Sequence, residues 1–162
     1  MIILGVDPGV AITGYAILDF NDKSTDVVDY GVIKTDSSTA FPLRLKKIYD
    51  EISQIIKQYR PQTLALEEVF YAQNIKTALK MGHVRAVTLL AAVNCQVAIS
   101  EFAPRKIKQA VTGNGAASKQ QVQKMVTQLL NLPQLPSSFD VSDAMAVAIC
   151  HCNRAMKNQL NI

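Results

Sequence analysis

Four acidic side chains stand beside apolar segments of this chain: Asp7, Glu67, Asp140 and Asp143. The first two each follow a short apolar run, and the last two open an apolar segment near the C-terminus. A carboxylate at the end of a buried strand is poorly hydrated, so it needs a cation. If the fold brings the four together, the natural cation is a hard divalent metal. Paired metals of this kind hydrolyse phosphodiesters, one activating the attacking water and the other stabilising the leaving 3′ oxygen.

Each acid also has a structural explanation. Asp7 precedes Pro8 and Gly9, which favour a turn. Asp140 and Asp143, three residues apart, suit the start of a helix, and Glu67 could be an ordinary charged strand end. The structural explanations become less convincing together, because three separate segments each place acid beside apolar sequence. An acid–base hydrolase of the glycosidase type would need only two carboxylates.

The basic residues are unevenly distributed along the chain. The net charge is +4, yet residues 1–68 hold ten acids and seven bases, whereas residues 69–139 hold eight bases and one acid. A positive half beside a carboxylate site indicates an anionic polymer as ligand. Scattered lysines on solvated helix faces are the alternative interpretation.

Length and composition indicate one globular domain. The chain has 162 residues, of which 49% are hydrophobic and 19% charged, which suits a single domain with a real core. We expect no membrane span and no signal peptide, and therefore a cytoplasmic protein. The three cysteines are odd in number, so free buried thiols are favoured over disulfides. Zinc at Cys150-His151-Cys152 is disfavoured because no second ligand pair follows.

Hydrophobic periodicity predicts alternating strands and helices. Strands are expected at 2–6, 13–18, 27–35, 63–66 and 97–102, and helices at 43–59, 75–93, 104–111, 118–130 and 140–157. The first three strands suggest an antiparallel meander. The order predicts an α/β fold, a mixed five-stranded sheet with helices on both faces, as one domain over 1–157 with a short tail at 158–162. Functional side chains in such sheets gather at strand ends.

Four motifs along the chain resemble those of the RuvC Holliday junction resolvases. They are Asp7-Pro8-Gly9 with Thr13-Gly14-Tyr15, Leu66-Glu67-Glu68-Val69-Phe70 with Ala72-Gln73-Asn74, the segment from Gly113-Asn114-Gly115 to Val122, and Asp140-Val141-Ser142-Asp143-Ala144. The resemblance implies a ribonuclease H-like fold, a homodimer and Mg²⁺-dependent cleavage of four-way DNA junctions. It also implies paired symmetric nicks with 5′-phosphate and 3′-hydroxyl ends, and a branch-migration helicase complex as partner.

The resemblance assigns roles to individual residues. It makes the four acids catalytic ligands of two Mg²⁺ ions, for which Mn²⁺ can substitute. It places Phe70 against bases near the crossover, where stacking is worth ~1–3 kcal/mol. It places Lys108 and Lys119 near the scissile phosphate, where they would neutralise transition-state charge. The predicted DNA-binding set is completed by basic residues of the positive half: Lys76, Lys80, Arg85 and Arg105. Glu68 and Tyr71 receive no role.

A dimer also follows from the substrate, because a two-fold dimer matches the approximate two-fold symmetry of a four-way junction. The apolar helix predicted at 75–93 is the candidate dimer face, with ordinary core packing as the alternative. Three other functions share parts of the pattern: a ribonuclease H-like nuclease that processes ribosomal RNA precursors, a non-catalytic junction binder, and a nucleotide-binding protein of the actin and sugar-kinase type. The last would need a second lobe for which 162 residues leave no room.

Overall fold

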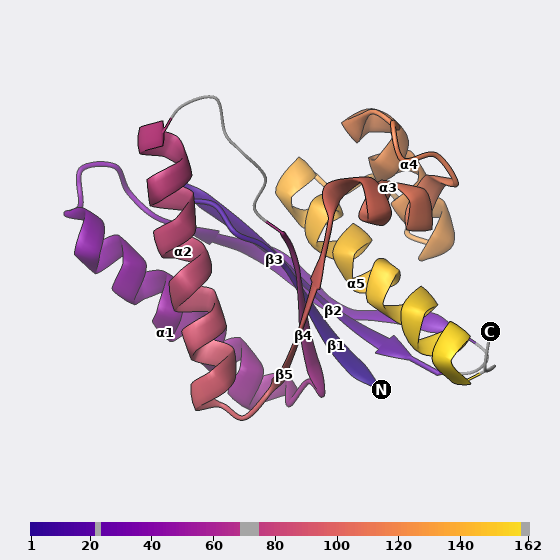
Figure 1. The fold of residues 1–162 in the computed structure, drawn as a ribbon, viewed down its shortest axis with the longest axis horizontal. Coiled ribbons are helices and arrows are strands. Elements are labelled where there is room, and N and C mark those ends of the chain that lie inside the picture. The colour runs from indigo at the N-terminus through magenta and orange to yellow at the C-terminus, as the bar shows by residue number, and fades with distance from the viewer. Residues whose placement is uncertain (22–23, 69–74, 160–162) are drawn as a thin grey trace.

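Five strands form one mixed sheet in this computed structural model, which describes residues 1–21, 24–68 and 75–159. The strands are β1 (Ile2–Asp7), β2 (Ile12–Phe20), β3 (Thr25–Lys34), β4 (Thr63–Glu67) and β5 (Ala98–Phe102). Their order across the sheet is β3-β2-β1-β4-β5. The first three pair antiparallel, and β4 pairs parallel with both β1 and β5 (Figure 1). The predicted meander and mixed sheet are confirmed.

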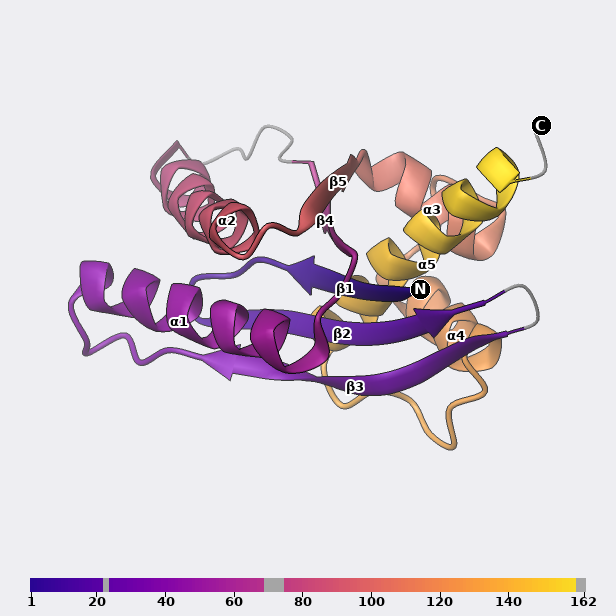
Figure 2. The same ribbon diagram turned by 90° about the horizontal axis from the view of Figure 1, so that it is seen from below.

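Helices cover both faces of the sheet. They are α1 (Phe41–Tyr59), α2 (Ile75–Asn94), α3 (Pro104–Thr112), α4 (Lys119–Leu129) and α5 (Phe139–Gln159). The pair α1 and α2 lies on one side of the sheet and α3, α4 and α5 lie on the other (Figures 1 and 2). The predicted α/β architecture is therefore confirmed.

The central strand β1 is apolar up to its last residue because both of its faces are buried. Ile3 belongs to the core cluster shared with α5, whereas Leu4 and Val6 belong to the cluster shared with α1. Side chains of a strand alternate between the two faces of a sheet, so one apolar run supplies both cores. This places Asp7, the last residue of β1, at the point where both cores end.

Local signals set several helix limits. Helix α1 ends at Arg60, which has a φ of 48° and precedes Pro61, so the next residue has no N–H to continue the helix. Helix α4 begins with a capping box in which Ser118 and Gln121 bond each other's backbone N–H groups. Helix α5 runs to Gln159, two residues past its predicted end. Because α5 crosses residue 157, the division there into domain and tail stays a prediction.

Two glycines allow α5 to lie directly on the sheet. A Cβ at Gly5 would stand 2.1 Å from the carbonyl oxygen of Ala144, and a Cβ at Gly14 would stand 2.1 Å from that of Asp140. Gly14 is also the pairing partner of Asp7. The start of α5 is therefore held beside the end of β1, where the acidic residues of both elements meet.

The three cysteines are free. Cys150 and Cys152 are buried in α5, and Cys95 is half-buried. The prediction of free, buried thiols is therefore confirmed for Cys150 and Cys152. No helix in the described part of the chain is long and apolar enough to cross a membrane.

Candidate active site

Asp7 and Glu67 lie side by side because their strands are parallel neighbours. Val6 of β1 pairs with Leu66 of β4, so the residues that end the two strands stand at the same edge of the sheet. Parallel strands place their carboxyl ends together, and this edge is the usual position of functional groups in an α/β sheet. The strand register therefore agrees with the prediction that both acids lie at strand ends.

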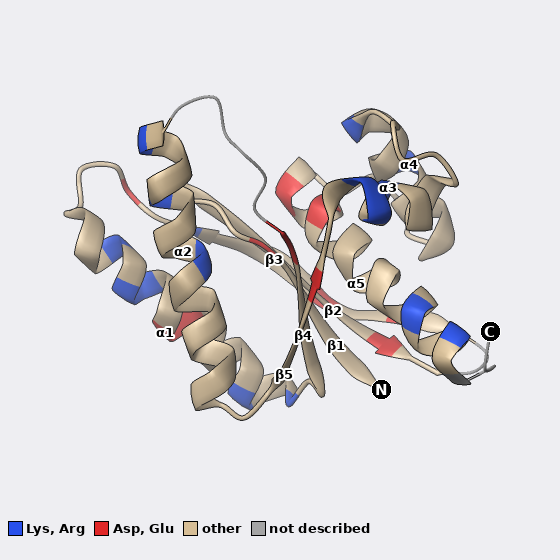
Figure 3. Cartoon of the chain, in the orientation of Figure 1, with Lys and Arg blue, Asp and Glu red and all other residues tan. Residues whose placement is uncertain are grey.

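A cavity of about 230 Å³ joins this edge to α3, α4 and α5. Its polar lining consists of three acids and two bases: Asp7, Glu67, Asp143, Lys108 and Lys119. We call it the carboxylate pocket. Figure 3 shows acidic segments at the end of β4 and the start of α5 close to basic segments on α3 and at the start of α4.

Asp140 stands at the margin of this group. It does not line the carboxylate pocket, although its charge acts on Asp7. Its carboxylate accepts a hydrogen bond from the Ser138 hydroxyl, and its own N–H donates to the Ser138 oxygen at 3.2 Å. The start of α5 therefore engages this side chain, as the helix-start interpretation proposed.

Burial and mutual repulsion raise the pKa values of two of the acids, Asp7 and Glu67. Burial, followed by the charges of Asp143 and Glu67, raises the pKa of Asp7 to about 8, and Lys119 opposes this rise. Burial and Asp143 also raise the pKa of Glu67 above its ordinary value, opposed by Lys119 and Lys108. Among the described residues, no hydrogen-bond donor reaches the Asp7 carboxylate. Asp7 is thus a largely buried acid that has no hydrogen-bond donor among the described residues.

Lys119 is the base of the pocket that is bonded to one of the acids. Its ammonium donates to Oδ2 of Asp143 at 2.8 Å. This hydrogen bond, with the charges of Asp143, Asp7 and Asp140, raises the pKa of Lys119. The lysine is the first residue of α4, and the capping box at Ser118 fixes where that helix begins. The motif that contains Lys119 therefore delivers a cation to the acids.

The donor set fits a divalent cation. Hard ions take carboxylate oxygens, and an ion beside Asp7 would offset the repulsion that raises its pKa. In the arrangement described, no group of three or more acidic, histidine or cysteine side chains encloses a metal position within residues 1–21, 24–68 and 75–159. Asp140 is turned to Ser138 and Asp143 to Lys119, so ligation would require both carboxylates to rotate.

The other predicted DNA-binding residues fall into different environments. Arg105 and Lys108 lie on α3, beside the carboxylate pocket. Lys80 lies on α2, 5.9 Å from the centre of the Phe41 ring, and Lys76 is exposed near the start of that helix. Phe70 and Tyr71 lie outside the described residues, so the stacking role of Phe70 stays a prediction.

Arg85 has a structural environment that sequence reasoning missed. Its guanidinium pairs with Glu101 and donates to the backbone carbonyl of Glu67. It therefore ties α2 to the ends of β4 and β5 and helps to orient Glu67. Its DNA contact stays a prediction. The only signal in the sequence is that Glu101 is the single acid of a basic half, which is too weak to identify the pair.

Known proteins similar to this chain share its length and its fold. The sequence model of the family described as crossover junction endodeoxyribonuclease RuvC matches residues 3–151. The RuvC of Alkaliphilus oremlandii is 51% identical over 94% of this chain and 93% of that protein. The RuvC of Desulforamulus reducens is 48% identical over 93% of each. The structure of Thermus thermophilus RuvC in complex with Holliday junction substrate superposes with a TM-score of 0.92 at 28% identity, covering 98% of this chain and 96% of that one.

Proposed function

Because the chain belongs to the RuvC family of crossover junction endodeoxyribonucleases, we propose that it resolves Holliday junctions. It nicks two strands of like polarity at symmetric positions and leaves 5′-phosphate and 3′-hydroxyl ends. The observation that carries this proposal is the carboxylate pocket, in which three acids from separate elements meet two lysines. A helix or strand end alone would not need acids from three elements at one point.

Asp7, Glu67, Asp140 and Asp143 are the residues that would hold Mg²⁺, with Mn²⁺ as a substitute. When bound, two such ions would supply an activated water and stabilisation of the leaving oxygen. The chain contributes the remaining conditions. It buries Asp7 so that its charge is expensive without a cation, and it holds Glu67 through the Arg85 contact with the Glu67 carbonyl.

Lys108 and Lys119 reach the same pocket from α3 and α4. Their place opposite the strand ends suits the neutralisation of charge on a phosphate that enters between helices and sheet. Donors aimed at developing charge in a partly dry pocket are worth far more than donors in water. The acids and the lysines therefore act on opposite sides of one scissile phosphate.

Binding is governed by junction shape, which the protein reads through phosphate contacts. The exposed basic residues beside the pocket, with Phe70 stacked on a base at the crossover, form the DNA surface. A base preference acts at the cleavage step. Cleavage rates that are identical across junctions of varied core sequence would contradict this preference. The family resemblance supports a cytoplasmic location and a branch-migration helicase complex as partner.

A second copy of the chain covers the outer side of α2. Four large apolar side chains of this helix are exposed by half or more of their surface: Ile75, Leu79, Leu90 and Val93. With the exposed Gly82 and Ala86, they recur at three- and four-residue spacing and form one face of the helix. The buried residues Val84, Thr88, Ala91 and Ala92 lie on the other side. An exposed apolar face of this extent marks an interaction surface, and two-fold pairing through it would present two pockets to one junction.

A substrate panel tests the proposed function. Synthetic four-way junctions, linear duplex and single-stranded ribosomal RNA precursor are incubated with the protein and Mg²⁺. The proposal predicts cleavage of the junction at a rate at least ~100-fold above that of duplex or RNA. Preferred cleavage of RNA would support the RNA-processing alternative. Tight junction binding without cleavage in Mg²⁺ or Mn²⁺ would support the non-catalytic binder.

A further inference from the structure

A second cavity lies beside the carboxylate pocket, between α3 and the loop that leads to α4. Its volume is about 580 Å³, and Pro104 and Lys108 line both cavities. Arg105, Gln109 and Asn114 also line it, and no acidic residue of the described chain does. We call this cavity the α3–α4 pocket. It is a basic hollow that continues the proposed path of the DNA strand.

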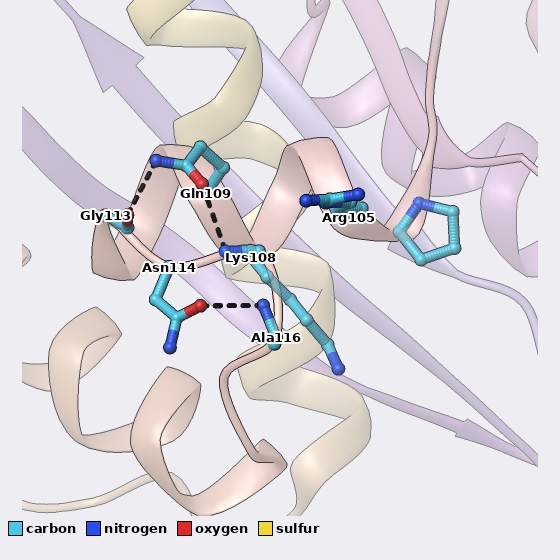
Figure 4. Close-up of a pocket in the computed structure, with 8 residues that line it drawn as sticks. Arg105, Lys108, Gln109, Gly113, Asn114 and Ala116 are labelled. Carbon is cyan, nitrogen blue, oxygen red and sulfur yellow. Dashed lines mark hydrogen bonds between the residues drawn. The ribbon is translucent and has the colours of Figure 1, made fainter.

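One side chain holds the loop in place. The Gln109 amide donates from Nε2 to the carbonyl of Gly113 at 2.6 Å and accepts at Oε1 from the N–H of Gly115 at 3.0 Å (Figure 4). It therefore fixes both sides of the turn at the end of α3. Gly113, with a φ of +73°, provides the left-handed residue that the turn requires.

The loop is bonded to itself at every step. The Thr112 hydroxyl accepts from the N–H of Asn114 at 3.1 Å, and the Asn114 side chain accepts from the N–H of Ala116 at 2.9 Å. These bonds occupy the loop amides, so the pocket offers side-chain donors to a ligand. A loop that is already ordered loses little conformational entropy when a ligand binds.

Gly115 lets the loop lie on Arg105. A Cβ at this position would stand 2.6 Å from Cγ of Arg105 and 3.1 Å from its carbonyl oxygen. The aliphatic part of the arginine is thereby confined while the residue remains exposed. Arg105 makes no ion pair or hydrogen bond with a described residue, in contrast to Arg85, which pairs with Glu101. It is a positioned cation without an anionic partner in the part of the chain that the structure describes.

We infer that the α3–α4 pocket binds a phosphate of the cleaved strand next to the scissile phosphate, with Arg105 as its ligand and Gln109 as a positioning residue. The inference rests on the proposed function in that the anion is a DNA phosphate. A guanidinium bonds two phosphate oxygens at once. Lys108, which lines both pockets, lies between this phosphate and the one that is cut. The contact fixes the strand's register at the carboxylates.

Neutral phosphates provide the test. Junctions are made with a single methylphosphonate at each position around the nick, and binding is measured in EDTA so that no cleavage occurs. The wild type is expected to lose about five- to tenfold in affinity at one flanking position. Arg105→Gln should bind the unmodified junction more weakly by a similar factor, lose nothing further at that position, and show a salt slope smaller by about one.

The matched control is Arg60→Gln. Arg60 ends α1 beside the strand edge opposite the acids, since Gln62 bonds Ile2 at the start of β1. It carries the same charge and should keep the full methylphosphonate pattern. If Arg105→Gln retained every methylphosphonate penalty of the wild type, the pocket would not bind a phosphate. Junction binding and nicking by the wild type would leave the proposed function intact in that case, whereas a wild type that ignored junctions would overturn both.

Gln109→Ala tests the positioning role without a change of charge. It should weaken junction binding about three- to fivefold in the wild-type background and leave the salt slope unchanged. In the Arg105→Gln background it should have no effect, because coupled residues are not additive. Equal losses in both backgrounds would show that Gln109 does not act through Arg105. A thermal melt of each variant separates local loosening of the loop from global unfolding.

Discussion

The ammonium of Lys119 lies 2.8 Å from Oδ2 of Asp143, so a lysine implicated in phosphate binding is bonded to an acid implicated in metal binding. While this hydrogen bond is intact, Asp143 cannot offer that oxygen to a metal ion and Lys119 cannot direct its ammonium fully to a phosphate. A divalent ion held by Asp143 would compete with Lys119 for this carboxylate, and the displaced ammonium would then be free to bind a DNA phosphate.

Replacement of Lys119 by methionine should therefore tighten metal binding and slow cleavage. We expect Mn²⁺ to bind the DNA-free variant about three- to tenfold more tightly, since a competing cation is lost. Junction cleavage should fall by about 10²-fold, the usual cost of one charge-stabilising donor. Calorimetric Mn²⁺ titration and single-turnover cleavage measure the two effects.

The control for this exchange is Lys108→Met. Lys108 lines the same pocket, but no ion pair joins it to an acid of the described chain. The Lys108→Met substitution removes the same charge as Lys119→Met. A purely long-range electrostatic effect would therefore raise the Mn²⁺ affinity equally in both variants. Equal affinities in the two variants would contradict the direct exchange at Asp143.

The raised pKa of Asp7 predicts that stability falls with pH when divalent ions are absent. The carboxyl has an ordinary pKa of 3.8 and one of about 8 in the fold. Between these values the unfolded chain has released a proton that the folded chain keeps, so stability declines as pH rises. We expect a loss of about 1–3 kcal/mol from pH 5 to pH 8, after allowance for partial exposure.

Urea denaturation in EDTA at several pH values measures this decline. Asp7→Asn should show a smaller change in the free energy of unfolding with pH, and it should be more stable than the wild type at pH 8. Mg²⁺ should restore the wild type at pH 8 and have a smaller effect at pH 5, where a proton competes for the site. Parallel profiles for the two proteins would mean that Asp7 is not the titrating group.

Gly14→Ala should disrupt the site without replacing an acid. The new Cβ would meet the Asp140 carbonyl oxygen, which is backbone and cannot rotate aside. Overpacking of this kind costs about 1–3 kcal/mol, and displacement of α5 should lower cleavage at least ~10²-fold. Urea unfolding and single-turnover rates provide the readouts. Full activity at unchanged stability would show that the contact between β2 and α5 does not position the acids.

The dimer proposal predicts that Leu90→Glu yields a monomer. Leu90 is 51% exposed on the outer face of α2, and a buried carboxylate in an apolar interface is costly. Leu129→Glu is the control, since Leu129 is 46% exposed on α4, on the other side of the molecule (Figure 1). Sedimentation analysis should give a monomer for the first and a dimer for the second. A dimeric Leu90→Glu would exclude this face.

Much of the fold was predictable because its signals are local. Short apolar runs marked the strands, and the Ser118 capping box and the proline after Arg60 marked helix limits. Strand β2 is longer than predicted, at Ile12–Phe20, because β3 pairs along its whole length through an irregularity between Ile17 and Leu18. Pairing between strands of that kind leaves no trace in periodicity.

The site was predictable only in part. The predicted strand ends identified Asp7 and Glu67. The two residues lie close together because β1 and β4 pair in parallel. The three-residue spacing of Asp140 and Asp143 suited a helix start, and the family resemblance gave both the same role. Only Asp143 lines the pocket, because Ser138 engages Asp140. The exchange at Lys119 and the support from Arg85 depend on contacts between distant segments, which the sequence does not reveal.

The most direct test of the account is nick mapping on a synthetic four-way junction in Mg²⁺, with wild type and Asp7→Asn compared. The wild type should cut two strands of like polarity at symmetric positions. Asp7→Asn should bind the junction within about threefold of the wild type and leave it uncut, because the ligand is lost and the DNA surface is kept. Cleavage by Asp7→Asn at the wild-type rate, or wild-type cleavage of linear duplex as fast as of the junction, would contradict the account.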